Sequence, residues 1–407
     1  MRVLQIVSSM NPDTGGVCEG IRNTLPAMET LDCNTDVVCL DADGETYGMV
    51  DSFRVFRLGA GRGPWSYCKN LNRWLHDSLA DYDAAVVNGL WLYHSFALTR
   101  VVRRLKQLGE VKVPKVFVMP HGMLDPWFQR DPSRRLKAYR NWLYWKSIEH
   151  RTVSQADGIL FTCKKELELA REPFRPYRPK RELNVGYGVS QPPAFVDSMK
   201  TAFRTACPEL DGRPYLLFLS RIHPKKGVDL LLRAYADVAR RQKSTDALPA
   251  LVVAGPTDSA YATEMVRLAE ELHLSGDESV NRSDSQPRVF FPGMLRGDAK
   301  WGAFYGCEAF VLPSHQENFG IAVVEALACG KPVLISNQVN IWDEIQDCQA
   351  CLVEDDTQAG TDRLIDRWLQ LPADARCEMG RAALRCYREN YQPETVAARF
   401  VSALSGV

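Results

Sequence analysis

Short apolar runs recur along the chain, each followed by a segment in which hydrophobic residues return every three or four positions. The first pattern is typical of buried strands, and the second of amphipathic helices that cover a sheet. In the clearest example, an apolar run at 309–313 leads through a polar loop into an apolar helix, a glycine at Gly330 and a second run at 331–335. This order is that of a parallel βαβ unit, and Gly330 stands where a glycine ends a helix.

The same alternation predicts strands on both sides of this unit. The expected strands are residues 2–7, 36–40, 53–58, 84–87, 115–119, 156–162, 182–185, 215–219, 251–256 and 288–293. Helical patterns separate many of them and also fill 358–370, 372–389 and 393–404. Residues 186–193, rich in glycine and proline, are the expected linker. The pattern therefore predicts two doubly wound α/β domains.

Composition agrees with two globular domains. The chain has 407 residues, of which 45% are hydrophobic and 25% charged, and its net charge is zero. A neutral chain is not expected to be a general nucleic-acid binder. No segment approaches the roughly 18 apolar residues of a membrane span, and the N-terminus has the pattern of a strand, not of a signal peptide.

The twelve cysteines show no paired framework, which favours free thiols in a reducing cytoplasm. Cys348 and Cys351 form a CxxC pair, but no second pair completes a zinc site. A thioredoxin-like role for this pair is disfavoured because it lacks the location in the fold that such a role needs.

Candidate chemistry gathers in the loop at 314–320, after a strand and before a helix. Ligands of open α/β sheets bind at such positions, where free N–H groups and the helix dipole favour anions. Glu317 lies in this loop, and Glu325 lies about one and a half turns inside the apolar helix. A carboxylate buried in such a helix needs a partner. Two partners are open: the hydroxyl pair of a sugar or ribose, or a neighbouring Arg or Lys.

The context of these two glutamates resembles a known family. Glu317 and Glu325 are separated by seven residues, after the run VLPS and before EALACGKPV, and the match continues through 337–344. This is similar to the nucleotide-sugar loop of retaining glycosyltransferases of family four, which have the GT-B fold. The resemblance implies two Rossmann-like domains facing across a cleft. It assigns an acceptor domain to 1–190, a donor domain to 191–390, and a C-terminal helix at 391–407 that crosses back to the first domain.

The resemblance also implies an activity. A sugar would pass from a UDP- or GDP-sugar to a saccharide or lipid-linked saccharide with retention of configuration, in the synthesis of surface polysaccharide or another glycoconjugate. Neither a metal nor a cofactor is expected, because the nucleotide sugar is itself the substrate. The base, the sugar and the acceptor are not specified. A phosphorylase or epimerase on the same fold, or a non-catalytic sugar-binding protein, remains an alternative.

Two loop cations of the second domain are candidates for the diphosphate. Arg221 and Lys226 precede a G-x-D-x-L run at 227–231. Most loop cations are simply solvated. The resemblance places this Arg–Lys pair on the donor diphosphate, where it would neutralise the charge of the leaving group.

The remaining donor contacts come from the resemblance alone. Glu325 would bind the ribose hydroxyls, and Glu317 would hold the sugar. The other expected donor-binding residues are Met294, Leu295, Asn318, Phe319, Gly320 and Ile321. Met294 and Leu295 would lie along the base, with core packing as the alternative, and the N–H groups of Gly320 and Ile321 would contact the diphosphate.

The first domain offers Gly16 and His121. Gly15–Gly16 stand at a strand–helix junction outside any GxGxxG pattern, so a tight turn is the alternative to a ligand contact. The resemblance places Gly16 facing the donor diphosphate. His121 directly follows the strand at 115–119, and the resemblance puts it near the transferred sugar, although a lone histidine is usually structural. His94 is a weaker candidate for the acceptor side.

The segment 131–146 combines aromatic and basic residues. Asp131 suits an N-cap and Pro132 the first helical position. One side carries Leu136, Tyr139, Leu143 and Ser147, and the basic residues are Arg134, Arg135, Lys137, Arg140 and Lys146. Three interpretations are open: a core-packed helix with a solvated basic face, an acceptor groove, or peripheral contact with an anionic membrane at its inner face.

Overall fold

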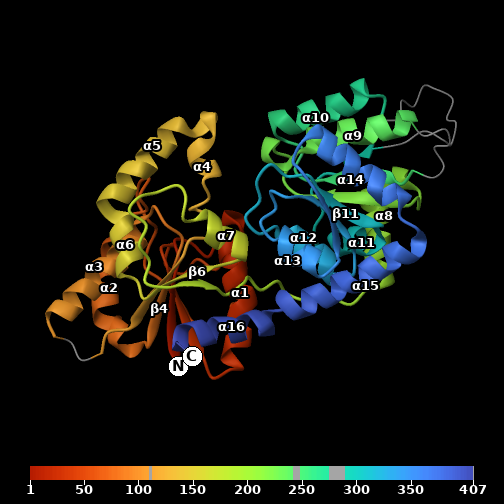
Figure 1. Cartoon of the computed structure of the whole chain (residues 1–407). Helices are drawn as coiled ribbons and strands as arrows, with labels where there is room; N and C mark the ends of the chain where they lie inside the picture. Colours follow the sequence, from red (N-terminus) through yellow and green to blue (C-terminus); the bar gives the residue numbers. More distant parts are fainter. Residues whose placement is uncertain (110–111, 242–247, 275–288, 407) are drawn as a thin grey trace. The chain divides into compact units, whose positions relative to one another are not determined.

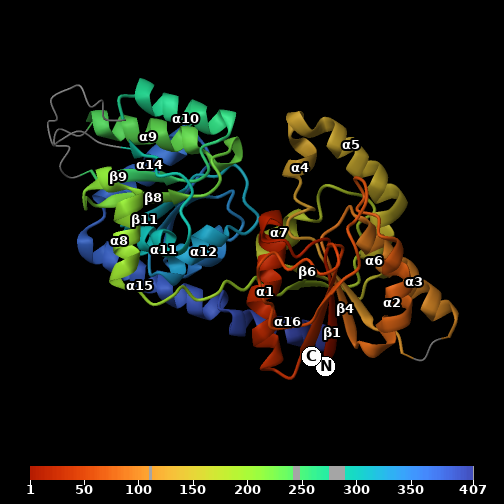
Figure 2. The same ribbon diagram turned by 180° about the vertical axis from the view of Figure 1, so that it is seen from behind.

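The computed structural model describes residues 1–109, 112–241, 248–274 and 289–406, and these form two compact units (Figures 1 and 2). The first unit contains Met1–Ser190 together with Asn390–Val407, and the second contains Gln191–Glu389. Each unit is an α/β layer structure around one parallel sheet.

The sheet of the first unit has the order β3-β2-β1-β4-β5-β6-β7, and every neighbouring pair is parallel. The strands are β1 Arg2–Ile6, β2 Asn34–Cys39, β3 Val55–Arg57, β4 Ala84–Asn88, β5 Lys115–Met119, β6 Gly158–Phe161 and β7 Glu182–Asn184. The chain leaves β1 toward one edge and returns to β4 on its other side. The loops after β1 and β4 therefore diverge at a topological switch point, where α/β sheets bind ligands.

Helices cover both faces of this sheet. They are α1 Gly16–Glu29, α2 Lys69–Ser78, α3 Tyr93–Gln107, α4 Trp127–Arg130, α5 Arg135–Tyr144, α6 His150–Gln155, α7 Lys164–Leu169 and α16 Pro393–Ser405. The inner strand β4 shows how the sequence builds two cores: Ala85 and Val87 enter one hydrophobic cluster, and Ala84 and Val86 enter the other. Successive strand residues point to opposite faces, so a continuous apolar run serves both layers.

The C-terminal helix belongs to the first unit. Helix α16 lies beside α1 (Figures 1 and 2), and its Ala397, Phe400 and Leu404 share a hydrophobic cluster with Val3 of β1. The last helix therefore completes the core of the unit that the N-terminus begins.

The second unit repeats the same plan with the order β10-β9-β8-β11-β12-β13. Its strands are β8 Tyr215–Leu219, β9 Ala250–Ala254, β10 Val289–Phe290, β11 Ala309–Leu312, β12 Val333–Ser336 and β13 Cys351–Glu354. Its helices are α8 Asp197–Ala206, α9 Val228–Arg241, α10 Ala260–Glu271, α11 Gly297–Gly306, α12 Ile321–Ala328, α13 Trp342–Asp347, α14 Gln358–Gln370 and α15 Ala373–Asn390. The switch point here lies between β8 and β11.

The structure confirms the βαβ unit and departs from the sequence prediction elsewhere. Gly330 has φ +69° and ends α12, as expected. Strand β13 was not predicted. The strand expected at 288–293 is reduced to Val289–Phe290, and Arg288 lies outside the described residues. All twelve cysteines are free thiols.

The segment expected as one helix at 131–146 is divided. Asp131 caps a 3-10 turn, Pro132–Arg134, by accepting from the Ser133 N–H at 2.9 Å, and α5 follows. The chain then widens into a π-turn at Trp145–Glu149 before α6. In the part of the chain that the structure describes, no helix is both long and apolar enough to span a membrane.

Candidate functional site

Two loops of the second unit are locked together at the carboxyl ends of neighbouring strands β8 and β11. The backbone oxygen of Lys225 accepts from the His315 N–H at 2.8 Å. Gly227 has φ +65°, and a Cβ at this position would lie 2.1 Å from the Pro313 oxygen. Only glycine fits such a close approach, so the β8–α9 and β11–α12 loops form one surface.

The surface brings two expected site residues into contact. The Lys226 ammonium pairs with Glu317 Oε2, and Lys226 is only 9% exposed. The backbone of Glu317 is fixed as well, because its N–H donates to Gln338 O and its oxygen accepts from the Asn340 N–H, both at 2.9 Å. A lysine ammonium has three donors, so its contact with Glu317 leaves it able to bind a further anionic group.

Arg221 lies exposed on the same β8–α9 loop, and it forms no ion pair with a described carboxylate. The pKa of the neighbouring His223 responds to the positive charge of this loop. Its pKa is lowered, first by desolvation and then by the charges of Arg221, Lys225 and Lys226. The loop is therefore a concentrated source of positive potential, which favours an anion.

The amino end of α12 adds neutral donors to this surface. Gly320 caps the helix with φ +81°, where a Cβ would lie 3.1 Å from Val323 Cγ2 and 3.3 Å from Glu317 Cγ. The N–H groups of the first turn, including Ile321 and Ala322, have no acceptor within the helix. This arrangement suits an anion such as a phosphate.

Glu325 has a protein partner. Its side chain is buried in α12, and Oε1 lies 2.6 Å from the Lys300 ammonium of α11. The ion-pair alternative from the sequence is thus present in the structure, and the burial of Glu325 no longer requires a ligand. Its assignment to a ribose rests on the resemblance alone and stays a prediction.

The other expected donor residues divide by exposure. Leu295 is 5% exposed and Phe319 is also 5% exposed, so both side chains pack into the unit. Met294 is 51% exposed and follows Gly293, which has φ +76° and accepts from the Gly255 N–H at 2.9 Å. Packing accounts for Leu295, whereas Met294 remains open to a ligand.

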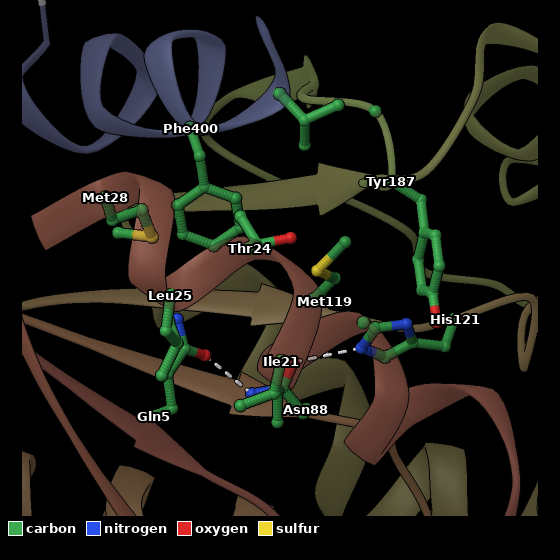
Figure 3. Close-up of a pocket in the computed structure, with 13 residues that line it drawn as sticks. Gln5, Ile21, Thr24, Leu25, Met28, Asn88, Met119, His121, Tyr187 and Phe400 are labelled. Carbon is green, nitrogen blue, oxygen red and sulfur yellow. Dashed lines mark hydrogen bonds between the residues drawn. The ribbon is translucent and has the colours of Figure 1, made fainter. Parts of the chain in front are cut away.

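In the first unit, His121 ends a short chain of hydrogen bonds (Figure 3). Its Nε2 lies 2.9 Å from Asn88 Oδ1, and Asn88 Nδ2 donates to Gln5 Oε1 at 2.8 Å. Because the Asn88 amide already donates to Gln5, its oxygen accepts from His121 Nε2–H. The proton of the neutral ring is therefore on Nε2, and Nδ1 carries a lone pair.

Gln5, Asn88 and His121 help to line a small cavity (Figure 3). Its volume is about 30 Å³, enough for a water molecule but not for a sugar. The lining residues are Gln5, Gly20, Ile21, Thr24, Leu25, Met28, Asn88, Met119, His121, Gly186, Tyr187, Val396 and Phe400. Desolvation in these surroundings lowers the pKa of His121 to about 4, so the ring is neutral at neutral pH.

The glycine-rich loop before α1 has a partner that the sequence did not reveal. Gly15 has φ +102° and ψ −155°, a region open essentially to glycine, and Gly16 begins α1. The Tyr187 hydroxyl donates to the Gly16 oxygen. A Cβ on Gly20 would lie 2.4 Å from the Tyr187 ring. The ring of Tyr187 is therefore accommodated by a glycine inside α1.

Two further buried groups shape the loops around His121. His94 is fully buried, and its Nε2 lies 2.9 Å from the backbone oxygen of Asn88. A buried ring in this position is not accessible to an acceptor sugar, although the sequence made it a weak candidate for that role. Glu166 Oε1 accepts from the Gly122 N–H at 2.5 Å and fixes the turn after His121. Sequence reasoning missed Gln5, Asn88 and Glu166 because each acts through residues far away in the chain.

Two protein-family models cover most of the chain. The model described as Glycosyl transferases group 1 matches residues 200–385, and the model described as Glycosyl transferase 4-like domain matches residues 15–188. The chain belongs to the group 1 glycosyltransferases. The two matches correspond to the two α/β units, and this family member has the GT-B fold.

Curated relatives match part of this glycosyltransferase family member. D-inositol 3-phosphate glycosyltransferase 2 of Catenulispora acidiphila is 32% identical over 195 residues, 46% of this chain and 41% of the relative. D-inositol 3-phosphate glycosyltransferase of Frankia alni is 33% identical over 201 residues, 45% of this chain and 47% of the relative. Each match therefore spans less than half the length of the relative.

Solved structures support the fold over the whole chain. A glycosyltransferase from Rickettsia africae has a TM-score of 0.73 at 13% identity and covers 100% of this chain and 98% of its own. Anabaena HepE in complex with UDP and glucose has a TM-score of 0.69 at 15% identity, with 100% of both chains covered. At such identities the likeness concerns the fold alone.

Proposed function

We propose that this protein transfers a sugar from a nucleoside-diphosphate sugar to a saccharide or lipid-linked saccharide, with retention of anomeric configuration. The observation that carries the proposal is the joined loop surface of the second unit, where Lys226 and Arg221 lie on one loop and α12 begins on the other. Such a surface suits a diphosphate, because positive charge and free N–H groups converge on one place.

In this proposal the surface stabilises the leaving group. As the bond from the sugar to the phosphate breaks, negative charge grows on the diphosphate while the sugar becomes oxocarbenium-like. Fixed cations and backbone donors lower the barrier because they stabilise the charge that develops in the transition state. Lys226 is the stronger candidate, since Glu317 already holds it in one position. The protein cations would take the part of a metal.

Glu317 and Glu325 would act on the donor in different ways. Glu317, in the β11–α12 loop, would accept a hydrogen bond from a sugar hydroxyl while it keeps its contact with Lys226. Glu325 would share its carboxylate between Lys300 and the ribose. The two glutamates would bind the donor and not serve as an acid–base pair, which must flank the bond that is cut.

The first unit would supply Gly16 and His121. A neutral His121 with its lone pair on Nδ1 would accept a hydrogen bond from a sugar hydroxyl and carry no charge toward the reacting sugar. Gly16 begins α1, and Gly15 before it adopts a backbone conformation that favours glycine. Neither residue places a side chain in this loop. That loop would leave room for the donor phosphates.

The names of similar proteins suggest the first substrates to test. Anabaena HepE was determined with UDP and glucose, so UDP-glucose is the first donor to try for this chain, followed by GDP-sugars. The curated relatives are named for D-inositol 3-phosphate, so a phosphorylated polyol belongs among the acceptors beside saccharides and lipid-linked saccharides.

The test is product analysis with the whole chain. The protein is incubated with each donor and acceptor, with and without EDTA, and the products are identified by mass spectrometry and the new linkage by NMR. We expect release of nucleoside diphosphate, a glycosylated acceptor with the donor's anomeric configuration, and turnover that survives EDTA. Products that require inorganic phosphate would indicate a phosphorylase, an epimerised donor an epimerase, and donor binding without turnover a sugar-binding protein.

A further inference from the structure

Helix α5 carries large apolar side chains on its outer side. Leu136 is 88% exposed, Tyr139 63%, Trp142 46% and Leu143 45%. Leu136, Tyr139 and Leu143 are spaced as i, i+3 and i+7, so they share one side of the helix, which in a globular protein normally faces the core. Of the three interpretations of this segment, the core-packed helix does not describe this side. We call these four residues the α5 outer face.

The charged residues of the segment that carries the α5 outer face, residues 132–148, are all basic. Arg135, Lys137, Arg140 and Lys146 are exposed, and no ion pair joins any of them to a described carboxylate. No Asp or Glu occurs between Asp131 and the fully buried Glu149. Counting 100° per residue, Arg140 and Lys137 lie beside Leu136 at one edge of the apolar strip, and Arg135 lies between Trp142 and Tyr139 near its other edge. Lys146 follows in the π-turn after α5.

The aromatic rings of the α5 outer face are ordered with these cations. Tyr139 and Trp142 stack at 6.1 Å with an interplanar angle of 19°. The Lys146 ammonium lies 5.9 Å from the centre of the Trp142 ring. Amphipathic rings beside cations are typical of segments that lie at the boundary between water and lipid headgroups.

The opposite side of the segment is anchored. Trp145 is fully buried, stacks on Phe174 at 4.9 Å, and donates from Nε1 to Pro176 O at 3.1 Å. Asn141 is also buried. The outer face is therefore presented by a helix that is fixed to its unit, and its exposure does not come from a loose end of the chain.

We infer that the α5 outer face docks on an anionic membrane surface. Charge complementarity decides for this occupant: lipid headgroups would neutralise the four cations while the boundary of the acyl chains takes up Leu136 and Trp142. A purely ionic partner would leave Leu136 exposed. In Figures 1 and 2, α4 and α5 extend beyond the strand ends of the first unit, and they follow β5 directly after the loop that holds His121. The inference does not depend on the proposed transfer reaction.

The experiment is co-sedimentation of the whole chain with vesicles of phosphatidylcholine that contain about 30 mol% phosphatidylglycerol, against pure phosphatidylcholine. We expect binding to the anionic vesicles only, weaker at high salt, with a blue shift of tryptophan fluorescence. Removing one cation near such a surface weakens binding about fivefold, so R135E/R140E should weaken it by at least about 25-fold. L136S/W142S should weaken binding while leaving the charge unchanged.

A matched control makes the same two charge reversals on another helix of the first unit. Arg103 and Arg104 are exposed on α3 of the same unit, and R103E/R104E should bind anionic vesicles far more tightly than R135E/R140E. Thermal melting and the transfer assay on water-soluble acceptors check that the α5 variants fold and react, and we expect both to be unchanged.

Several results would overturn the inference. The first is that the wild type fails to bind anionic vesicles, or that R103E/R104E loses binding as much as R135E/R140E. A second is that L136S/W142S binds anionic vesicles as tightly as the wild type, and that both proteins also bind a soluble polyanion such as heparin. That result would indicate a site for polyanions and not for a membrane. A dimer in gel filtration that L136S/W142S abolishes, without vesicle binding, would show that a second copy covers this face.

Discussion

The carboxyl edges of the two sheets differ in charge, although six strands of each sheet follow the same order. In the second unit the edge loops carry Arg221 and Lys226, with Glu317 as a counter-ion. In the first unit, a chain of uncharged groups from β1 and β4 ends at His121 after β5, and the pKa of His121 is lowered to about 4. The fold supplies the place in both units, and the loop residues decide whether that place favours an anion or a neutral hydroxyl.

Removing the charged group of the second edge should have the largest effect. Lys226→Ala should lower kcat about 100-fold or more, because an electrostatic stabiliser of the leaving group is lost. The measurement is steady-state release of nucleoside diphosphate. Lys225→Ala is the matched control, since it removes a neighbouring cation of the same loop, and it should retain most of the activity. If both variants turn over like the wild type, the diphosphate does not bind at this edge.

A buried acid of the first unit, Glu149, should make the stability of the fold depend on pH. Glu149 is fully buried, accepts from the Trp91 N–H at 2.9 Å and from Ser95 Oγ at 2.7 Å, and desolvation raises its pKa to about 7. A raised pKa means that the folded state holds the proton more tightly, so stability is greatest at low pH and is lost as pH rises toward 7.

Between pH 5 and pH 7 this single group should remove about 2 kcal/mol of the free energy of unfolding. Glu149→Gln, which cannot ionise, should flatten the dependence over that range. Urea unfolding at several pH values measures it. An identical pH dependence in the variant would mean that Glu149 does not ionise in this window.

Placing a charge on the neutral edge should shift the titration of His121. Asn88→Asp would put a carboxylate beside Nε2 and raise the pKa of His121 by about one unit or more. NMR titration of the ring measures the shift. Asn88→Ser, which removes the amide without adding charge, is the control. A pKa unchanged in Asn88→Asp would show that the ring does not contact residue 88 in solution.

The smallest effect is expected at Glu325. Glu325→Gln keeps the shape of the side chain and one acceptor oxygen, and it should weaken donor binding about fivefold, the order of one ordinary hydrogen bond. Lys300→Met tests the counter-ion in the same calorimetric titration. Unchanged affinity in Glu325→Gln, with a lowered melting temperature in both variants, would reduce the pair with Lys300 to a structural role.

The sequence predicted the features that depend on local order. The βαβ unit around 309–335 follows from apolar runs and a helix-ending Gly330, and the Asp131 cap follows from an Asp that directly precedes Pro132. Strand β13 was missed because its apolar run, Cys351–Val353, is short and lies between polar segments.

Long-range contacts could not be predicted in this way. Lys300 reaches Glu325 from another helix, and the chain from Gln5 through Asn88 to His121 joins the ends of three strands. The amphipathic pattern of α5 revealed an apolar side but not what would cover it. Hydrophobic periodicity reports which residues share a face, whereas the packing of the whole unit decides whether that face is buried.

The central claim is that the joined loops of the second unit bind a nucleoside diphosphate, and titration calorimetry with UDP and GDP tests it most directly. We predict that at least one of them binds the wild type and Lys225→Ala alike, and binds Lys226→Ala at least about tenfold more weakly. Failure of both nucleotides to bind the wild type, or equal affinity for Lys226→Ala, would contradict it.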